Sequence, residues 1–102
     1  MVFHSHGEIG EIIEKMVRLV RYTPNRVFPE RASKLLDFKS QVPDFKVLIK
    51  TCIAFANGAG GRIIIGVEES TREIIGVSET DLWRIYADFP HSLYEATAPE
   101  IA

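Results

Sequence analysis

The sequence contains a single cysteine, Cys52, and no long hydrophobic run. One thiol cannot form an internal disulfide, and it also excludes a zinc site built from several cysteines. No apolar stretch approaches the roughly 20 residues that a helix needs to cross a bilayer. The first residues lack the basic and then apolar layout of a signal peptide. We therefore expect a cytoplasmic protein that does not associate with a membrane.

The composition is that of an ordinary globular protein. Of 102 residues, 46% are hydrophobic and 25% are charged, which is enough to build one domain with its own core. No internal repeat or low-complexity tract divides the chain. We expect a single domain over residues 1–102. Because the last residues carry no recognisable stop signal, we also expect it to be the N-terminal part of a longer protein.

The net charge of −2 hides a separation of the charges along the chain. The first two thirds are basic, and the acids that follow Ile63 outnumber the bases there. A basic segment attracts a phosphate backbone through counterion release. The alternative is that the linear separation averages out once the chain is folded. The bases of the first part are Lys15, Arg18, Arg21, Arg26, Arg31, Lys34, Lys39, Lys46, Lys50 and Arg62.

The first half of the sequence predicts two helices and a strand. Apolar residues recur at helical spacing from Gly7 to Tyr22, which indicates an amphipathic N-terminal helix. Leu35–Lys39 alternates as a short strand, with Leu36 and Phe38 on one face. Phe45–Asn57 is apolar nearly all round, so we expect an interior helix, with Asp44 as its N-cap.

The second half predicts a hairpin and a further helix. Arg62–Val67 is β-branched and bounded by glycines, so it indicates a central strand, and Arg72–Val77 is the expected returning strand after a turn at 68–71. A helix capped by Ser78 or Thr80 should run to about residue 87 and end at Pro90. The expected fold is α/β (α+β): a small mixed sheet with a hairpin, packed on a buried central helix, with flanking N- and C-terminal helices.

The glycines of the stretch FANGAGGRIIIGV, residues 55–67, have a structural and a functional interpretation. Structurally, Gly58 fits a left-handed helix C-cap, Gly60 and Gly61 allow a tight reversal, and Gly66 indicates a close backbone approach or a bulge. Functionally, backbone N–H groups of Asn57, Gly58, Gly60 and Gly61 could form a concavity for an anion. The order helix, glycines, strand is the reverse of a nucleotide-binding P-loop.

Five motif pieces in order resemble the Schlafen AlbA-like domain family. They are the strand LLDFK, the helix end AFAN, the pair Gly60–Gly61, the stretch IGVEE at 65–69, and IGV at 75–77, within residues 33–77. The resemblance implies a compact α/β fold and a nucleic-acid-binding role, for DNA or RNA. It also implies a module of a transcriptional regulator, an ATP-binding protein or a helicase-related protein, so ATP is a possible ligand.

Nucleolytic members of that family hold a metal ion with three carboxylates. The resemblance carries these positions onto Ala32, Asp37 and Glu69. Ala32 cannot ligate a metal, and Glu30 lies two residues away from it. Two carboxylates can hold Mg²⁺ or Mn²⁺ only weakly, so a metal-dependent nuclease or a nucleotide-binding regulator is the second hypothesis. The alternatives are an ion pair for Asp37 and a turn position for Glu69.

The first hypothesis is a domain that binds nucleic acid without cutting it, through phosphate contacts from Lys39, Lys46, Lys50 and Arg62. A third is an interaction module: an isoleucine stripe at positions 9, 12 and 13 could dock on a partner or form a homodimer, or could simply pack on its own sheet. Trp83 and Tyr86 could stack on bases, although packing under the sheet is the expectation we favour. Cys52 is expected to be a small buried apolar residue.

Overall fold

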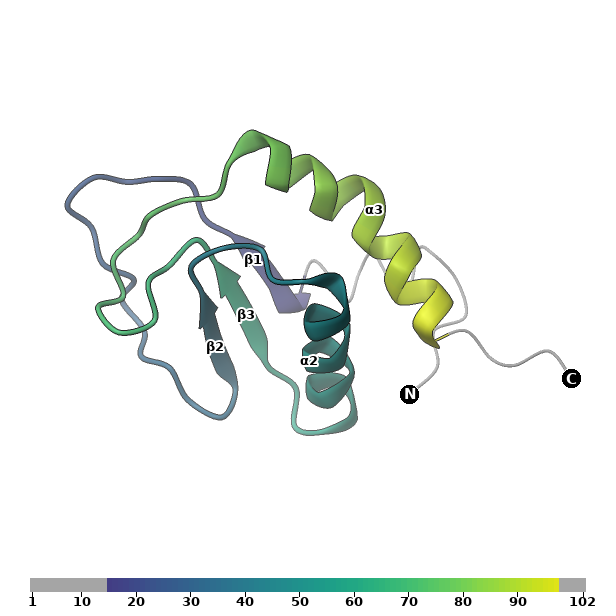
Figure 1. Ribbon diagram of the computed structural model, residues 1–102. Helices are drawn as coiled ribbons and strands as arrows, with labels where there is room; N and C mark the ends of the chain where they lie inside the picture. The colour runs from purple at the N-terminus through teal and green to yellow at the C-terminus, as the bar shows by residue number, and fades with distance from the viewer. Residues whose placement is uncertain (1–14, 98–102) are drawn as a thin grey trace, which may run out of the picture.

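The computed structural model describes residues 15–97, which form an α/β fold with two helices and a three-stranded sheet (Figure 1). The strand order is β1-β3-β2, and both pairings are parallel. This confirms the expected fold class, although the sheet is parallel where a mixed one was expected. The elements are β1 (Val17–Leu19), β2 (Leu36–Lys39), α2 (Phe45–Asn57), β3 (Arg62–Ile65) and α3 (Glu79–Thr97).

The central strand β3 has the sequence RIII, and its three isoleucines are fully buried. A strand that is covered on both faces needs an apolar residue at every position, which this run supplies. In the register with β2, Leu36 pairs with Arg62 and Lys39 pairs with Ile65. Parallel neighbours need a crossover connection, and α2 provides it between β2 and β3.

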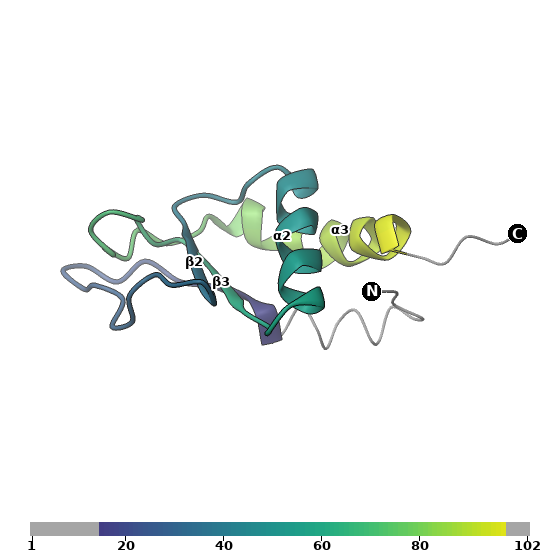
Figure 2. The same ribbon diagram turned by 90° about the horizontal axis from the view of Figure 1, so that it is seen from below.

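The two faces of the sheet carry different layers (Figure 2). The helices α2 and α3 lie on one side, and the segments 20–35 and 66–78 lie on the other. On the helix side Ile63 and Ile65 belong to a cluster that also holds Val17, Leu48, Cys52, Ile85, Phe89 and Leu93. On the loop side Ile64 packs with Phe28, Leu36, Phe38 and Val67. The hydrophobic core therefore consists of two clusters, one on each face of the sheet, and β3 contributes residues to both.

Helix α2 has the predicted bounds and the predicted cap. The Asp44 carboxylate accepts a hydrogen bond from the Lys46 backbone N–H at 2.8 Å, as an N-cap should. The expected interior position is wrong, because only Leu48 and Cys52 of this helix are buried and Val47 is 48% exposed. A crossover helix covers the sheet with one side only, so even a mostly apolar one keeps an outer face in water.

The predicted N-terminal helix is wrong over its second half. Residues 7–14, including the isoleucine stripe, lie outside the described part of the chain. Lys15 and Met16 are helical, but Val17–Leu19 form the strand β1. Val17 is buried and Arg18 is exposed, which is the alternation of a strand. Parallel pairing with β3 supplies backbone partners that a local pattern cannot reveal.

The predicted hairpin is present as a turn with single bridges. Val67 pairs with Ile74, and the Glu68 N–H donates to the Glu73 carbonyl at 2.9 Å. The expected continuous strand Arg72–Val77 does not form. Arg72 has a positive φ of 62°, and the segment divides its hydrogen bonds between the Gly66–Glu68 side and the 26–28 segment on the other side. Because the backbone hydrogen bonds of this segment alternate between two neighbouring segments, it forms no continuous ladder with either of them.

Helix α3 begins after Ser78, whose hydroxyl accepts from the Asp81 N–H at 3.2 Å, so one of the two predicted caps is confirmed. The predicted end at Pro90 is wrong, because the helix continues through Pro90 to Thr97. Phe89 and Leu93 are fully buried on either side of the proline. Their burial against the sheet offsets the hydrogen bond that a proline removes.

The glycine-rich connection between α2 and β3 is explained mainly by structure. Gly58 has a φ of −104°, so the predicted left-handed cap is wrong. Its N–H nevertheless caps the helix, donating to the carbonyls of Ala54 and Phe55. The predicted close approach at Gly66 is confirmed, because a Cβ there would lie 2.9 Å from the Val20 carbonyl oxygen. Neither helix in the part of the chain that is described is long and apolar enough to cross a membrane.

Candidate functional site

Two adjoining hollows lie between β1 and α3. The first, of about 450 Å³, is lined by Arg21, Val77, Glu79, Leu82, Trp83 and Tyr86. The second, of about 340 Å³, is lined by Lys15, Met16, Val17, Arg18, Leu19, Arg62, Ile85 and Tyr86. Tyr86 belongs to both. We call this surface the β1–α3 groove and define it by Lys15, Arg18, Arg21, Arg62, Trp83 and Tyr86.

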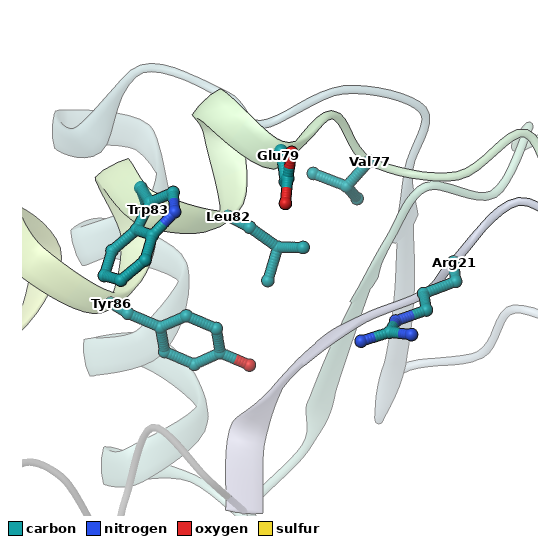
Figure 3. Close-up of a pocket in the computed structure, with 6 residues that line it drawn as sticks. All are labelled: Arg21, Val77, Glu79, Leu82, Trp83 and Tyr86. Atoms are coloured by element: carbon teal, nitrogen blue, oxygen red, sulfur yellow. The ribbon is translucent and has the colours of Figure 1, made fainter.

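The first hollow has an aromatic wall and a basic wall. In Figure 3, Trp83 and Tyr86 project from α3 on one side, Arg21 extends from the segment after β1 on the other, and Leu82 lies between them. Glu79 stands at the start of α3 and is the only acid among the described residues that lines either hollow. The site therefore offers flat apolar surface beside a cation.

Positive charge continues into the second hollow. Lys15 and Arg18 are exposed, and no acid among residues 15–97 forms an ion pair with them or with Arg21. The Arg18 guanidinium lies 5.8 Å from the centre of the Phe28 ring, so its charged end lies toward the loop-side layer at the β1 edge of the sheet. Arg21 thus lines the first hollow, and Lys15, Arg18 and Arg62 line the second at the β1 edge of the sheet, where the charged ends of Arg18 and Arg62 lie toward the loop side.

Arg62 is shared between the groove and an ion pair. Its guanidinium donates to the Glu30 carboxylate at 2.5 Å, with both side chains about half exposed. This hydrogen bond, and then the charge of Glu30, raise the pKa of Arg62. Arg62 therefore stays protonated, and the Glu30 carboxylate partly balances its positive charge.

The four bases expected to contact phosphate do not share one surface. In the register of β2 and β3, Lys39 faces the helix side with Ile65, whereas Arg62 faces the loop side with Leu36 and Ile64. They also lie at opposite ends of the strands. Lys39 forms an ion pair with Asp37 at 3.5 Å. Lys46 and Lys50 are exposed one turn apart on the outer side of α2.

The amides expected to cradle an anion are largely engaged within the connection itself. The Gly58 N–H donates to two α2 carbonyls, and the Gly60 N–H donates to the Phe55 carbonyl at 3.0 Å. Gly61 lies so close to the Phe55 ring that a Cβ would overlap it. Asn57 is the last residue of α2 and is exposed. This connection is shaped to close the helix and to enter β3.

The comparison with known protein families shows which family the chain belongs to. Residues 33–99 match the family described as Schlafen, AlbA_2. The chain belongs to this family. The match starts at the approach to β2 and includes α3 with Trp83 and Tyr86, but it leaves out β1. Comparisons with the curated proteins and with the solved structures find no match.

In this Schlafen AlbA_2 domain the carboxylates that could hold a metal ion are dispersed. Asp37 pairs with Lys39, and Glu30, the nearest acid to Ala32, pairs with Arg62 on the opposite face of the sheet. Glu69 is exposed in the turn after Val67. Within residues 15–97 no three His, Cys, Asp or Glu side chains gather into a group that could hold a metal ion. The described residues give no observation that favours metal-assisted cleavage.

Cys52 of the Schlafen AlbA_2 domain is buried in the helix-side cluster, as its sequence context predicts. Burial raises the pKa of its thiol to about 11, because the thiolate would lose its hydration. The side chain therefore stays protonated near neutral pH. It acts as a small apolar residue and lacks the activated thiolate that a nucleophile requires.

The expectation that Trp83 and Tyr86 pack under the sheet is wrong. Trp83 is 70% exposed and Tyr86 is 63% exposed. The buried stripe of α3 consists of Ile85, Phe89 and Leu93. These residues follow one another at helical spacing, and positions 83 and 86 fall beside that stripe. This offset was readable in the sequence, whereas the position of Arg21 opposite the two rings depends on β1, which the sequence did not reveal.

Proposed function

We propose that this domain binds nucleic acid, and that the β1–α3 groove is where it does so. The observation that carries the proposal is the gathering of Lys15, Arg18, Arg21 and Arg62 along two hollows that share Tyr86. A row of cations that spans two hollows fits a ligand with repeated negative charge better than a single small anion. The family resemblance points to the same class of ligand.

The contacts available are those that bind without strong sequence preference. Lysine and arginine side chains neutralise phosphates and release counterions, whatever the bases are. The proposed affinity is moderate, because three or four phosphate contacts supply it and Glu79 opposes it at one end. In a longer regulator or helicase-related protein, such a domain would attach the rest of the chain to the polymer.

The first prediction tests the ligand and its location together. Fluorescence anisotropy of labelled single-stranded DNA, RNA and duplex, at about 50 and about 200 mM salt, should show binding that falls steeply as salt rises. The double variant Arg18→Gln/Arg21→Gln should weaken binding at low salt. It should also lower the slope of log K against log salt for single strands by about 1.4, or about 0.7 for each lost contact.

A matched comparison uses the two exposed lysines of α2. The variant Lys46→Gln/Lys50→Gln removes the same charge from a surface outside the groove, and we expect a smaller loss of affinity and slope. A larger loss from the α2 pair than from the β1 pair would move the site to α2 and overturn the location. If the wild-type domain binds no nucleic acid even at low salt, the function itself is overturned.

A further inference from the structure

Trp83 and Tyr86 are large aromatic residues whose rings are mostly exposed on α3. They are 70% and 63% exposed and lie three residues apart on α3, so their rings project on the same side of the helix. Single exposed apolar residues are normal on protein surfaces. Two large rings that line one hollow with a cation opposite form a more specific arrangement, because a ring offers a flat face for stacking.

The first hollow matches the chemistry of one nucleotide unit. Its volume of about 450 Å³ lies within the range of small-ligand sites. The rings of Trp83 and Tyr86 supply stacking surface, and Arg21 on the opposite wall supplies a partner for a phosphate (Figure 3). The Glu79 carboxylate can accept a hydrogen bond from an amino group on a base edge, although it repels phosphate.

We propose that the domain prefers single-stranded nucleic acid, with an unpaired base stacked on Trp83 and Tyr86. This inference rests on the proposed function. In a duplex each base face is covered by its neighbours, so the rings could gain nothing there. In a single strand a base can turn into the hollow while the phosphates follow Arg21, Arg18 and Lys15.

The adjoining second hollow favours a strand over a free nucleotide. It shares Tyr86 with the first hollow and adds Lys15, Arg18 and Arg62. A mononucleotide would occupy the first hollow and would leave the charges of Lys15 and Arg18, which form no ion pair within residues 15–97, without a phosphate. A strand would place its next phosphates along them, so affinity should rise with length over the first few nucleotides.

Trp83 is the only tryptophan of the chain, so its fluorescence reports directly on this hollow. Oligothymidylate of about 15 nucleotides should quench the emission at low salt, since stacking places a base against the indole. Trp83→Ala and Tyr86→Ala, followed by anisotropy, should each weaken single-strand binding about 5- to 150-fold. Duplex binding should change by less than about twofold, because the phosphate contacts remain. Tyr86→Phe keeps the ring and should retain most of the single-strand affinity.

Tyr22→Ala provides the matched control. Tyr22 is 67% exposed but lines neither hollow, so its removal should leave single-strand affinity unchanged. If strand and duplex bind equally, and Trp83→Ala alters neither, the stacking inference is overturned while the proposed function stands. Quenching by thymidine monophosphate as strong as that by the oligonucleotide would overturn the assignment to a strand. Absence of binding by any nucleic acid would remove both.

Discussion

Gly66 directly follows β3 and packs closely against Val20 and Gly76. Its φ is +105°, and a Cβ would lie 2.9 Å from the Val20 carbonyl oxygen and 3.1 Å from the Gly76 carbonyl carbon. Gly60, in the connection before β3, has a similar φ of +91°, but a Cβ there would meet no atom within 4 Å. Gly60 is therefore required only for its positive φ, whereas Gly66 is required both for its positive φ and because a Cβ would not fit.

The second prediction compares alanine at these two positions. Gly60→Ala should lower the free energy of unfolding by about 1–2 kcal/mol, the cost of a left-handed conformation for a residue with a Cβ. Gly66→Ala should cost about 1–3 kcal/mol more, because backbone atoms must also move. Urea unfolding followed by circular dichroism measures both. Equal losses would mean that the contact between Gly66 and the 20–22 segment is not constrained as described.

At the level of single residues the sequence was informative wherever the cause was local. The alternation of Leu36 and Phe38 with Asp37 and Lys39, and the cap at Asp44, were both predicted and confirmed. The opposite orientation of Lys39 and Arg62 could not be predicted, because it depends on the register between strands that are joined through α2. Charge along the sequence therefore located the basic half of the chain but not the basic surface.

Among the elements, α3 shows most clearly how packing overrides local propensity. Pro90 lies inside this helix, where it has no N–H to donate to the Tyr86 carbonyl four residues earlier. Proline costs about 3 kcal/mol relative to alanine in a helix interior. The fully buried residues Ile85, Phe89 and Leu93 hold both halves of α3 on the sheet, so the helix passes the proline. A prediction based only on neighbouring residues ends the helix at Pro90, because it does not include these tertiary contacts.

The third prediction follows from this conflict. Pro90→Ala should raise the free energy of unfolding by about 1–2 kcal/mol, less than the full difference in helix propensity, because the proline also restricts the unfolded chain. Ser92→Ala, two residues later in the same helix, already has its N–H and should gain only about 0.5 kcal/mol. Thermal and urea unfolding measure the pair. A loss of stability in Pro90→Ala would show that α3 depends on the contacts of the proline ring.

The strand β1 is ambiguous in the sequence, because its residues fit both the spacing of a strand and the spacing of a helix. Val17 and Leu19 flank Arg18, which suits a strand, while the longer stretch around them also has helical spacing. The decision comes from β3, whose backbone lies more than 40 residues later in the sequence and pairs Val17 with Ile63. The groove was hidden from sequence reasoning for the same reason, since Arg18 and Arg21 line hollows shared with α3 residues only because β1 pairs with β3.

For the whole molecule, the shared strand β3 links the two layers. Ile64 faces the loop-side cluster, and Ile63 and Ile65 face the helix-side cluster. Small domains of this length usually unfold in one cooperative transition. Here the physical basis is that neither layer can keep its apolar face covered once β3 leaves the other.

The fourth prediction tests that coupling. Ile64→Val and Ile65→Val should each lower the free energy of unfolding by about 0.5–1.5 kcal/mol, although they remove a methylene from opposite sides of the sheet. Hydrogen exchange can follow both layers at once.

The Ile74 N–H, bonded to the Arg26 carbonyl, reports on the loop side, and the N–H of Cys52 within α2 reports on the helix side. Protection of both amides should fall together in either variant, because opening the double core exposes both. If Ile64→Val weakened only the Ile74 amide, the loop-side layer would open by itself. The second hollow, which contains no residue of the 20–35 and 66–78 segments, would then keep its shape independently of them.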